Sequence, residues 1–240
     1  MPASPQDPPA PTDTARIVDT ELHRWRRIYH GETYYYGEEP GPVARRAVRY
    51  HRAFMPHGGA ALDAGCGEGQ DLAFLAERGY TPTGIEFTEE GAEKARRLLA
   101  ARGLRGEVLQ ADLRTLDPSQ QYDLVLAVNS VQFMGLDALP CLERLMEMVA
   151  PGGVLGLSLF AREAGQPEVG GTVYYITLAE LLERFGDWQC LESAQLWQWN
   201  VQNNHPQPFV TLVAQKTPRA RELTRVSTSP FPGRGKSNDG

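Results

Sequence analysis

The clearest chemical signal in the sequence is an acidic, glycine-rich stretch. Residues 62–69 read Leu-Asp-Ala-Gly-Cys-Gly-Glu-Gly. The apolar residues before it indicate the end of a buried strand, and residues 70–78 carry apolar side chains at helical spacing. Glycines without a Cβ let a ligand approach the backbone and the helix N-terminus. A partly buried carboxylate needs a partner, so Asp63 predicts a ligand with a cationic amino group.

The glycine spacing separates two classes of cofactor. A dinucleotide site uses the pattern Gly-x-Gly-x-x-Gly, which seats a pyrophosphate on the helix N-terminus. Here the glycines are Gly65, Gly67 and Gly69, and Gln70 stands where that pattern has its third glycine. Asp63 would also lie beside the phosphates, where its charge is unfavourable. The pattern therefore argues against a dinucleotide.

Further polar residues follow later strands. Residues 81–86 predict a strand that ends on Glu86, and a carboxylate at this place in such folds accepts the ribose hydroxyls of a nucleoside. Residues 107–110 predict a third strand, followed by Asp112. The apolar run 122–128, typical of a central parallel strand buried on both faces, ends at Asn129. We expect Asp63, Glu86 and Asp112 to meet in one cleft.

Aromatic and basic residues dominate the segment before the glycine turn. A helix is expected over residues 18–29, followed by Tyr34-Tyr35-Tyr36 between glycines and prolines. This tyrosine segment is either an extended cover on the core or a lid over a cofactor or acceptor, since aromatic faces attract a sulfonium cation. The next helix, 43–55, carries an arginine stripe (Arg45, Arg49 and Arg52) that is either a solvated face or an attractor of anions.

The remaining pattern predicts the end of an α/β domain. A helix is expected up to the Pro-Gly-Gly of residues 151–153, and then a strand over 154–160. Thr177 and Glu180 form a capping-box pattern that begins another helix. The runs 188–201 and 208–216 predict a terminal antiparallel hairpin. We therefore expect a Rossmann-like, doubly wound mixed sheet of about seven strands.

Composition excludes several classes of protein. The net charge of −6 argues against a nucleic-acid binder, and no run approaches the roughly 18 apolar residues of a membrane span. Three widely spaced cysteines without a Cys/His cluster indicate reduced thiols and no metal site, and the N-terminus lacks a secretory signal pattern. We expect a cytoplasmic protein in which Cys66 is a small turn residue rather than a nucleophile.

Together these motifs resemble the class I S-adenosylmethionine (SAM)-dependent methyltransferases. The resemblance covers about residues 18–216. The sequence motifs are similar to those of the tellurite-resistance and thiopurine methyltransferase group, and the similar residues include Trp25 and the tyrosine segment. It implies a methyltransferase domain over residues 15–216 with an N-terminal helical cover at 15–57. Residues 1–14 and 217–240, which have few apolar side chains, are expected to be disordered tails.

The resemblance also implies that SAM is the cofactor and indicates which residues bind it. The methionine end would lie on the glycine turn, the ribose on Glu86, the adenine at the third strand and the sulfonium near the Asn129 backbone. The expected cofactor-binding residues are Asp63, Gly65, Cys66, Gly67, Glu86, Phe87, Asp112, Leu113, Asn129, Trp25 and Tyr35.

The expected function is methyl transfer to a small molecule by in-line displacement. A thiol, selenium or tellurium acceptor would need little base, whereas an oxygen acceptor would need one, for which Tyr34, Glu163 and His205 are candidates. Acceptor contacts are expected from Tyr34, Gln132 and Phe133. The alternatives are a non-catalytic SAM-binding module, a nicotinamide-dependent oxidoreductase and methylation of a macromolecule. The acceptor and the oligomeric state stay open.

Overall fold

A seven-stranded mixed sheet forms the centre of the molecule in the computed structural model, which describes residues 13–200 and 204–218. The first five strands are parallel, β9 is antiparallel to β5 and β8 is antiparallel to β9. This arrangement confirms the predicted Rossmann-like sheet and its terminal hairpin. Across the sheet the order is β3 (Glu107–Gln110), β2 (Thr81–Glu86), β1 (Ala60–Ala64), β4 (Tyr122–Val128), β5 (Val149–Phe160), β9 (His205–Lys216) and β8 (Trp188–Asn200).

Helices cover both faces of this sheet. Strand β4 shows why, because Leu124 and Leu126 pack on one face, Val125 and Ala127 on the other, and all four are fully buried. The first face is covered by α2 (Pro42–Phe54), α3 (Gln70–Glu77) and α4 (Glu89–Ala101). The second is covered by α5 (Ala138–Glu147) and α6 (Leu178–Arg184).

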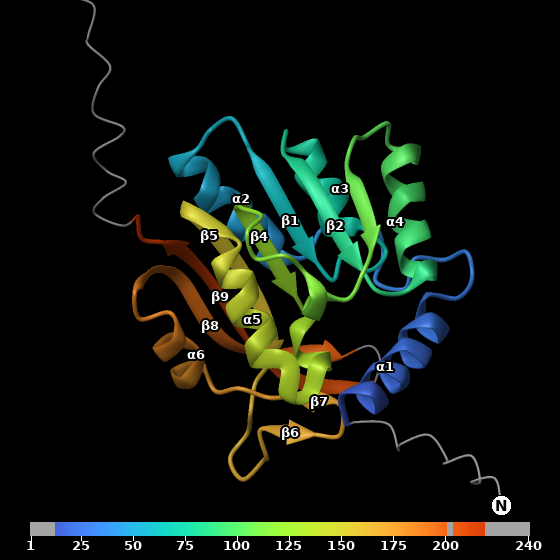
Figure 1. The fold of residues 1–240 in the computed structure, drawn as a ribbon, viewed down its shortest axis with the longest axis vertical. Coiled ribbons are helices and arrows are strands. Elements are labelled where there is room, and N and C mark those ends of the chain that lie inside the picture. Colours follow the sequence, from blue (N-terminus) through green and yellow to red (C-terminus); the bar gives the residue numbers. More distant parts are fainter. Residues whose placement is uncertain (1–12, 201–203, 219–240) are drawn as a thin grey trace, which may run out of the picture.

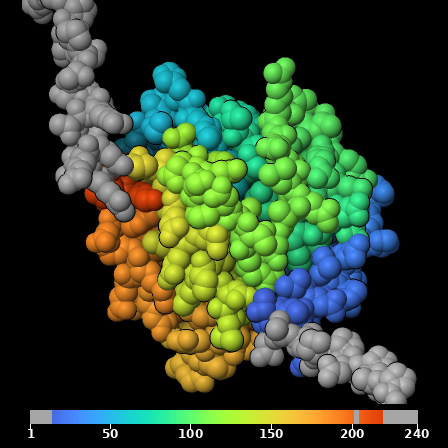
Figure 2. Space-filling model, viewed as in Figure 1, coloured from blue at the N-terminus to red at the C-terminus, as the bar shows by residue number. Residues whose placement is uncertain are grey.

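Residues at the carboxyl edge of the parallel strands build the site. The strands β1, β2 and β4 run toward α1 (Asp13–Tyr29), which lies across this edge (Figure 1). Two 3₁₀ helices, η1 (Leu113–Thr115) and η2 (Val131–Asp137), follow β3 and β4 there. Helix α1 packs against η2 and α4. In Figure 2 the blue surface of α1 lies directly against the green surface of later segments.

Local sequence explains where several helices begin. The Thr88 side chain accepts a hydrogen bond from the Gly91 amide at the start of α4, as its N-cap position predicts. Thr177 and Glu180 form the predicted capping box of α6. Helix α2 begins on Pro42, whose fixed φ suits the first turn of a helix.

The structure corrects some boundaries. Helix α1 begins at Asp13, so it includes the last two residues of the segment 1–14 expected to be a tail, and residues 1–12 lie outside the described ones. Val149 belongs to β5, where it pairs with Tyr122, and not to the preceding helix. Helix η2 and a small hairpin of β6 (Val169–Gly170) and β7 (Val173–Tyr174) were not expected. Most of the expected C-terminal tail, and Val201, also lie outside the described residues.

Two general findings bear on the class of protein. Among the described helices, each is too short or too polar to cross a membrane. Within residues 13–200 and 204–218, no group of three His, Cys, Asp or Glu side chains is arranged to hold a metal ion.

Candidate functional site

The glycine turn needs glycine for two reasons, backbone conformation and space. Gly65 and Gly67 have φ of 81° and 53°, in the left-handed region that favours glycine. A Cβ on Gly65 would lie 2.3 Å from Ser130 Cβ, and one on Gly67 would lie 2.8 Å from Tyr29 Oη. The Gly65 amide also donates to the Ile85 carbonyl at 2.8 Å, which holds the turn against β2. Bare backbone therefore lines the carboxyl edge of β1.

Asp63, at the end of β1, is a buried carboxylate with one unpartnered oxygen. Its side chain accepts from the Leu72 backbone, whereas Oδ2 has no hydrogen-bond partner within the protein. Burial, together with the charges of Asp71 and Glu86, raises the pKa of Asp63 well above its ordinary value. A cationic donor at Oδ2 would satisfy the oxygen and stabilise the ionised form, as the sequence predicts for a ligand amino group.

Glu86 is held in place at the end of β2 by hydrogen bonds from Gly67, Thr88 and the Phe87 backbone. The Gly67 amide donates to Oε2 at 3.1 Å, and the Thr88 amide and hydroxyl donate to Oε1 at 2.9 and 2.6 Å. Burial raises the pKa of Glu86, although these hydrogen bonds act in the opposite direction.

Asp112 caps η1 and forms an ion pair with Arg114. The Arg114 guanidinium contacts it at 2.6 Å, and the Arg114 amide donates to Oδ1 at 3.0 Å. Burial alone would raise the pKa of Asp112, but the hydrogen bonds and charge of Arg114 outweigh it and lower the pKa. Arg114 also reaches Asp137 at 3.4 Å. Asp112 is thus ionised and oriented beside the buried Leu113.

Two cavities lie along this edge and share part of their walls. The smaller, of about 70 Å³, extends from Gly65 over Glu86 and Phe87 to Asp112 and Leu113. The larger, of about 270 Å³, lies over Asp63 and the glycine turn; we call it the larger cleft. The residues common to both are Trp25, Tyr29, Gly65, Asn129 and Phe133. The three carboxylates expected to meet in one cleft therefore lie on two adjoining cavities.

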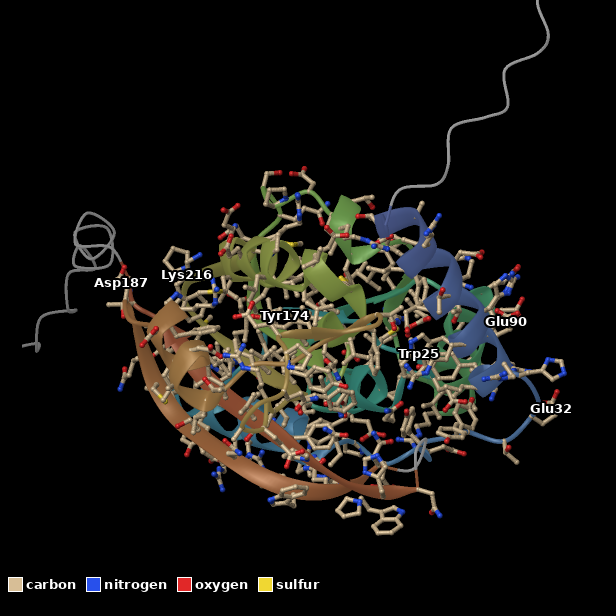
Figure 3. All side chains as sticks on the ribbon, turned by 90° about the horizontal axis from the view of Figure 1, so that it is seen from below. Trp25, Glu32, Glu90, Tyr174, Asp187 and Lys216 are labelled. Atoms are coloured by element: carbon tan, nitrogen blue, oxygen red, sulfur yellow. The ribbon has the colours of Figure 1, made fainter. Side chains whose placement is uncertain are left out.

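Helix α1 covers the junction of the cavities. The Trp25 ring makes an edge contact with Phe133 at a centroid distance of 5.0 Å and lies 5.4 Å from the Tyr29 ring. Its Nε1 donates to the buried Glu21 carboxylate at 3.0 Å. Figure 3 shows Trp25 on the inner side of α1, whereas Glu32, just beyond the helix, points outward. Trp25 thus lies where the sequence expects a cover, and Tyr29 joins it.

The tyrosine segment lies differently from the expectation. Tyr36 lines the larger cleft, whereas Tyr35 is 38% exposed and lines neither cavity. The Tyr35 and Tyr36 amides both donate to Glu68 Oε2, and these hydrogen bonds fix the backbone of the segment. Tyr34 donates to the Lys94 carbonyl at 3.2 Å and also lies off both cavities. The structure therefore puts Tyr36, rather than Tyr35 or Tyr34, on the wall of the larger cleft.

Some of the other residues that the sequence predicts as ligand contacts line a cavity, and others do not. Phe133 lines both cavities, but Gln132 is fully buried, lines neither and has an amide without a hydrogen-bond partner. The base candidates Tyr34, Glu163 and His205 also line neither cavity. Cys66 lines the larger cleft, and its burial, with Asp63 and Glu86 nearby, raises the pKa of its thiol well above the ordinary value. This thiol is therefore a poor nucleophile.

Sequence reasoning missed two carboxylates that fasten the tyrosine segment. Glu68 forms a buried ion pair with Lys94, whose Nζ also donates to the Thr33 carbonyl at 2.6 Å. Asp71, on α3, accepts from the Gly41 amide at 2.7 Å and lines the larger cleft. An acid directly inside a glycine turn is a signal that could have identified Glu68, but its partner Lys94 lies 26 residues away.

Comparisons with known proteins find similarity to methyltransferases. Residues 61–153 match a family described as "Methyltransferase domain". The chain is similar to an "Uncharacterized methyltransferase YodH" of Bacillus subtilis, with 30% identity over 50% of this chain and 51% of that protein. It is also similar to a trans-aconitate 2-methyltransferase of Azoarcus, with 34% identity over 48% of this chain and 45% of that one. The chain thus spans about half the length of these relatives.

Solved structures share the fold. TehB from Haemophilus influenzae matches 82% of this chain and 67% of its own with a TM-score of 0.63 and 18% identity. A 1,6-didemethyltoxoflavin-N1-methyltransferase of Burkholderia thailandensis matches 89% of this chain and 94% of its own with a TM-score of 0.62 and 21% identity. Residues 61–153 thus match a methyltransferase domain, and the chain shares the fold of these solved structures.

Proposed function

We propose that this protein binds SAM along the two adjoining cavities and transfers its methyl group to a small molecule. The single observation that carries the proposal is the unpartnered Oδ2 of buried Asp63 beside a glycine-lined cleft. A SAM amino group would satisfy that oxygen. When bound, SAM supplies a methyl group on a sulfonium that is already an activated leaving group.

The residues of the chain have separate tasks in this proposal. Glu86 would accept from the ribose hydroxyls, and Asp112 with the Leu113 amide would bind the adenine. Gly65 and Gly67 would let the cofactor lie against the backbone, and Asn129 would lie near the sulfonium. Trp25, Tyr29 and Phe133 lie over the junction of the cavities and would exclude water from the reacting atoms.

The acceptor must react without a base supplied by the three candidates from the sequence. Tyr34, Glu163 and His205 all lie off both cavities, which favours acceptors that attack unaided. A soft nucleophile such as a thiol, selenium or tellurium species is one such class, and a neutral amine is another. Small-molecule acceptors also suit the size of the larger cleft, about 270 Å³.

A binding and transfer experiment tests the proposal. The thermal midpoint of the purified protein should rise saturably with SAM and with its demethylated product, because a ligand that binds only the folded state stabilises it. No rise at millimolar concentrations of either would contradict the proposal. A rise with NAD instead would support the oxidoreductase alternative. A rise with SAM but no labelled methyl transfer to small molecules or lysate macromolecules would support a non-catalytic module.

A further inference from the structure

The charged residues of the larger cleft are all of one sign. Its described lining includes four acidic side chains and no lysine, arginine or histidine. Glu68 is neutralised by Lys94, and Glu39 reaches Arg45 at 3.1 Å on the surface. Asp63 would pair with the SAM amino group, so buried Asp71 is the acid that sets the potential inside the cleft once the cofactor is bound. The other polar lining groups are hydroxyls and amides, which tolerate either sign of charge.

The acceptor side of the larger cleft is aromatic. Trp25, Phe133, Phe160 and Phe209 form one buried cluster and all line the cleft. Phe160 makes edge contacts with Phe133 at 5.6 Å and with Phe209 at 5.0 Å. Arg24 lies against the Phe133 ring but also pairs with Glu21, and it lines neither cavity. Such a wall suits a flat apolar ring and attracts positive charge on it.

One hydroxyl between these two regions offers lone pairs to a ligand. Ser158 lines the cleft beside Asn129, and its Oγ donates to Asn129 Oδ1 at 2.8 Å. Because its hydrogen is used in that bond, Ser158 Oγ presents acceptor sites to the cleft. An acceptor molecule that carries an N–H would find a partner there, whereas an oxyanion would meet lone pairs.

We propose that the acceptor is a neutral nitrogen nucleophile, an amine or ring nitrogen, carried on a flat apolar ring. The inference rests on the proposed methyltransferase function. The nitrogen lone pair forms the new bond to the methyl carbon, and the carbon–sulfur bond breaks with its electrons going to sulfur. Positive charge thereby moves from sulfur to nitrogen. An amine nitrogen then loses its proton to water, whereas a ring nitrogen without an N–H keeps the charge.

The charge of the cleft favours this step over the alternatives. With a neutral nitrogen the positive charge persists through the reaction, so Asp71 stabilises it throughout. A thiolate, a carboxylate or an oxyanion of selenium or tellurium would enter the cleft against this carboxylate. Its methylation would also remove the cation that Asp71 stabilises. The cleft therefore selects against anionic acceptors.

Matched ligands on one ring test the inference. Naphthylamine, naphthalenethiol and naphthoate would be titrated calorimetrically into the protein saturated with demethylated SAM, and assayed for labelled methyl transfer from SAM. We expect naphthylamine to bind about ten-fold more tightly than naphthoate, the scale of a like-charge penalty, and to be the one that takes the label. Equal or tighter binding of naphthoate, or preferential labelling of the thiol, would overturn the charge inference.

A pair of variants on β8 tests whether charge inside the larger cleft decides which ring compound binds. Gln198 lines the larger cleft, whereas Gln195 on the same strand is exposed and lines neither cavity. Gln198→Lys should reverse the preference toward naphthoate, and Gln195→Lys should leave it unchanged. An unaltered preference in Gln198→Lys would contradict the assignment of the cleft.

The controls distinguish this inference from the proposed function. Failure of demethylated SAM to bind would reject the methyltransferase proposal itself. If demethylated SAM binds but none of the three ring compounds does, the aromatic acceptor site is rejected and the cofactor site stands. Phe160→Ala should weaken binding of all three compounds alike, because it removes part of the shared wall without changing charge.

Discussion

Lys94 Nζ lies 2.7 Å from Glu68 Oε1, and both side chains are withdrawn from solvent. The pair joins three parts of the chain, because Glu68 lies in the glycine turn, Lys94 lies on α4 and both contact the tyrosine segment. A buried charge that loses its partner is strongly destabilising. The pair thus ties the turn that forms the site to the segment that borders it.

Lys94→Met should destabilise the fold by about 3–5 kcal/mol, because it leaves Glu68 buried without a counter-ion. Urea unfolding measures this free energy. The matched control is Arg97→Met on the same helix, since Arg97 pairs with Glu32 at 3.6 Å in an exposed position. Its cost should stay below about 1 kcal/mol. Equal costs in the two variants would contradict the role given to the buried pair.

Gly67→Val should abolish binding of SAM and of its demethylated product. The new side chain would begin 2.8 Å from Tyr29 Oη and would fill the floor of the larger cleft. Gly103→Val is the control, because Gly103 also has a positive φ, of 63°, but a Cβ there meets nothing within 4 Å. Both variants carry backbone strain, so only loss of affinity confined to Gly67→Val supports this position of the site. Calorimetry provides the readout.

Asp63→Asn should weaken binding of demethylated SAM by about 1–3 kcal/mol, the scale of a hydrogen bond to a charged group. The same variant should unfold at no lower urea concentration than the wild type, because ionised Asp63 is buried and unfavourable in the free protein. Asp187→Asn, at the other end of the molecule from Trp25 (Figure 3), serves as control. Unchanged affinity in Asp63→Asn would remove Asp63 from the amino-group role.

Stability should depend on pH through Asp71. Burial raises the pKa of Asp71 to about 6, although the Gly41 amide and the Arg45 charge act in the opposite direction. Because this folded-state pKa lies above the unfolded value of about 3.9, the folded state binds the extra proton between these values. The free energy of unfolding therefore falls as pH rises from about 4 to about 6 and then levels off.

Asp71→Asn tests that dependence. It keeps an oxygen to accept from the Gly41 amide but carries no charge, so it should be more stable than the wild type by about 1–3 kcal/mol at neutral pH. The difference should shrink as pH falls and disappear below about pH 3, where Asp71 is protonated in both states. Urea unfolding across this pH range measures it, and a difference that does not vary with pH would reject the assignment to Asp71.

Local sequence was sufficient for the glycine turn and for the order of the main helices and strands, but not for η2, β6 and β7. Strand and helix periods, the Thr88 cap and the Thr177–Glu180 capping box depend on residues a few positions apart, so each could be predicted without a fold. Asp63, Glu86 and Asp112 followed from the rule that parallel strands end at one edge. The residue-by-residue roles at the cofactor remain predictions that the proposed variants test.

Tertiary structure alone decided which side chains line the cavities and what charge they present. The sequence by itself determined an α/β chain with a bare turn beside a carboxylate, because those features are encoded by neighbours along the chain. Contact with Glu68 fixes the backbone of the tyrosine segment, in which Tyr36 rather than Tyr35 lines the larger cleft, and η2 placed Phe133 but not Gln132 on its wall. Phe160, Phe209 and Gln198 come from β5, β9 and β8, so their common cleft arises only when the hairpin pairs with the sheet. Such pairings join residues far apart in sequence, and their geometry depends on packing that no local pattern records.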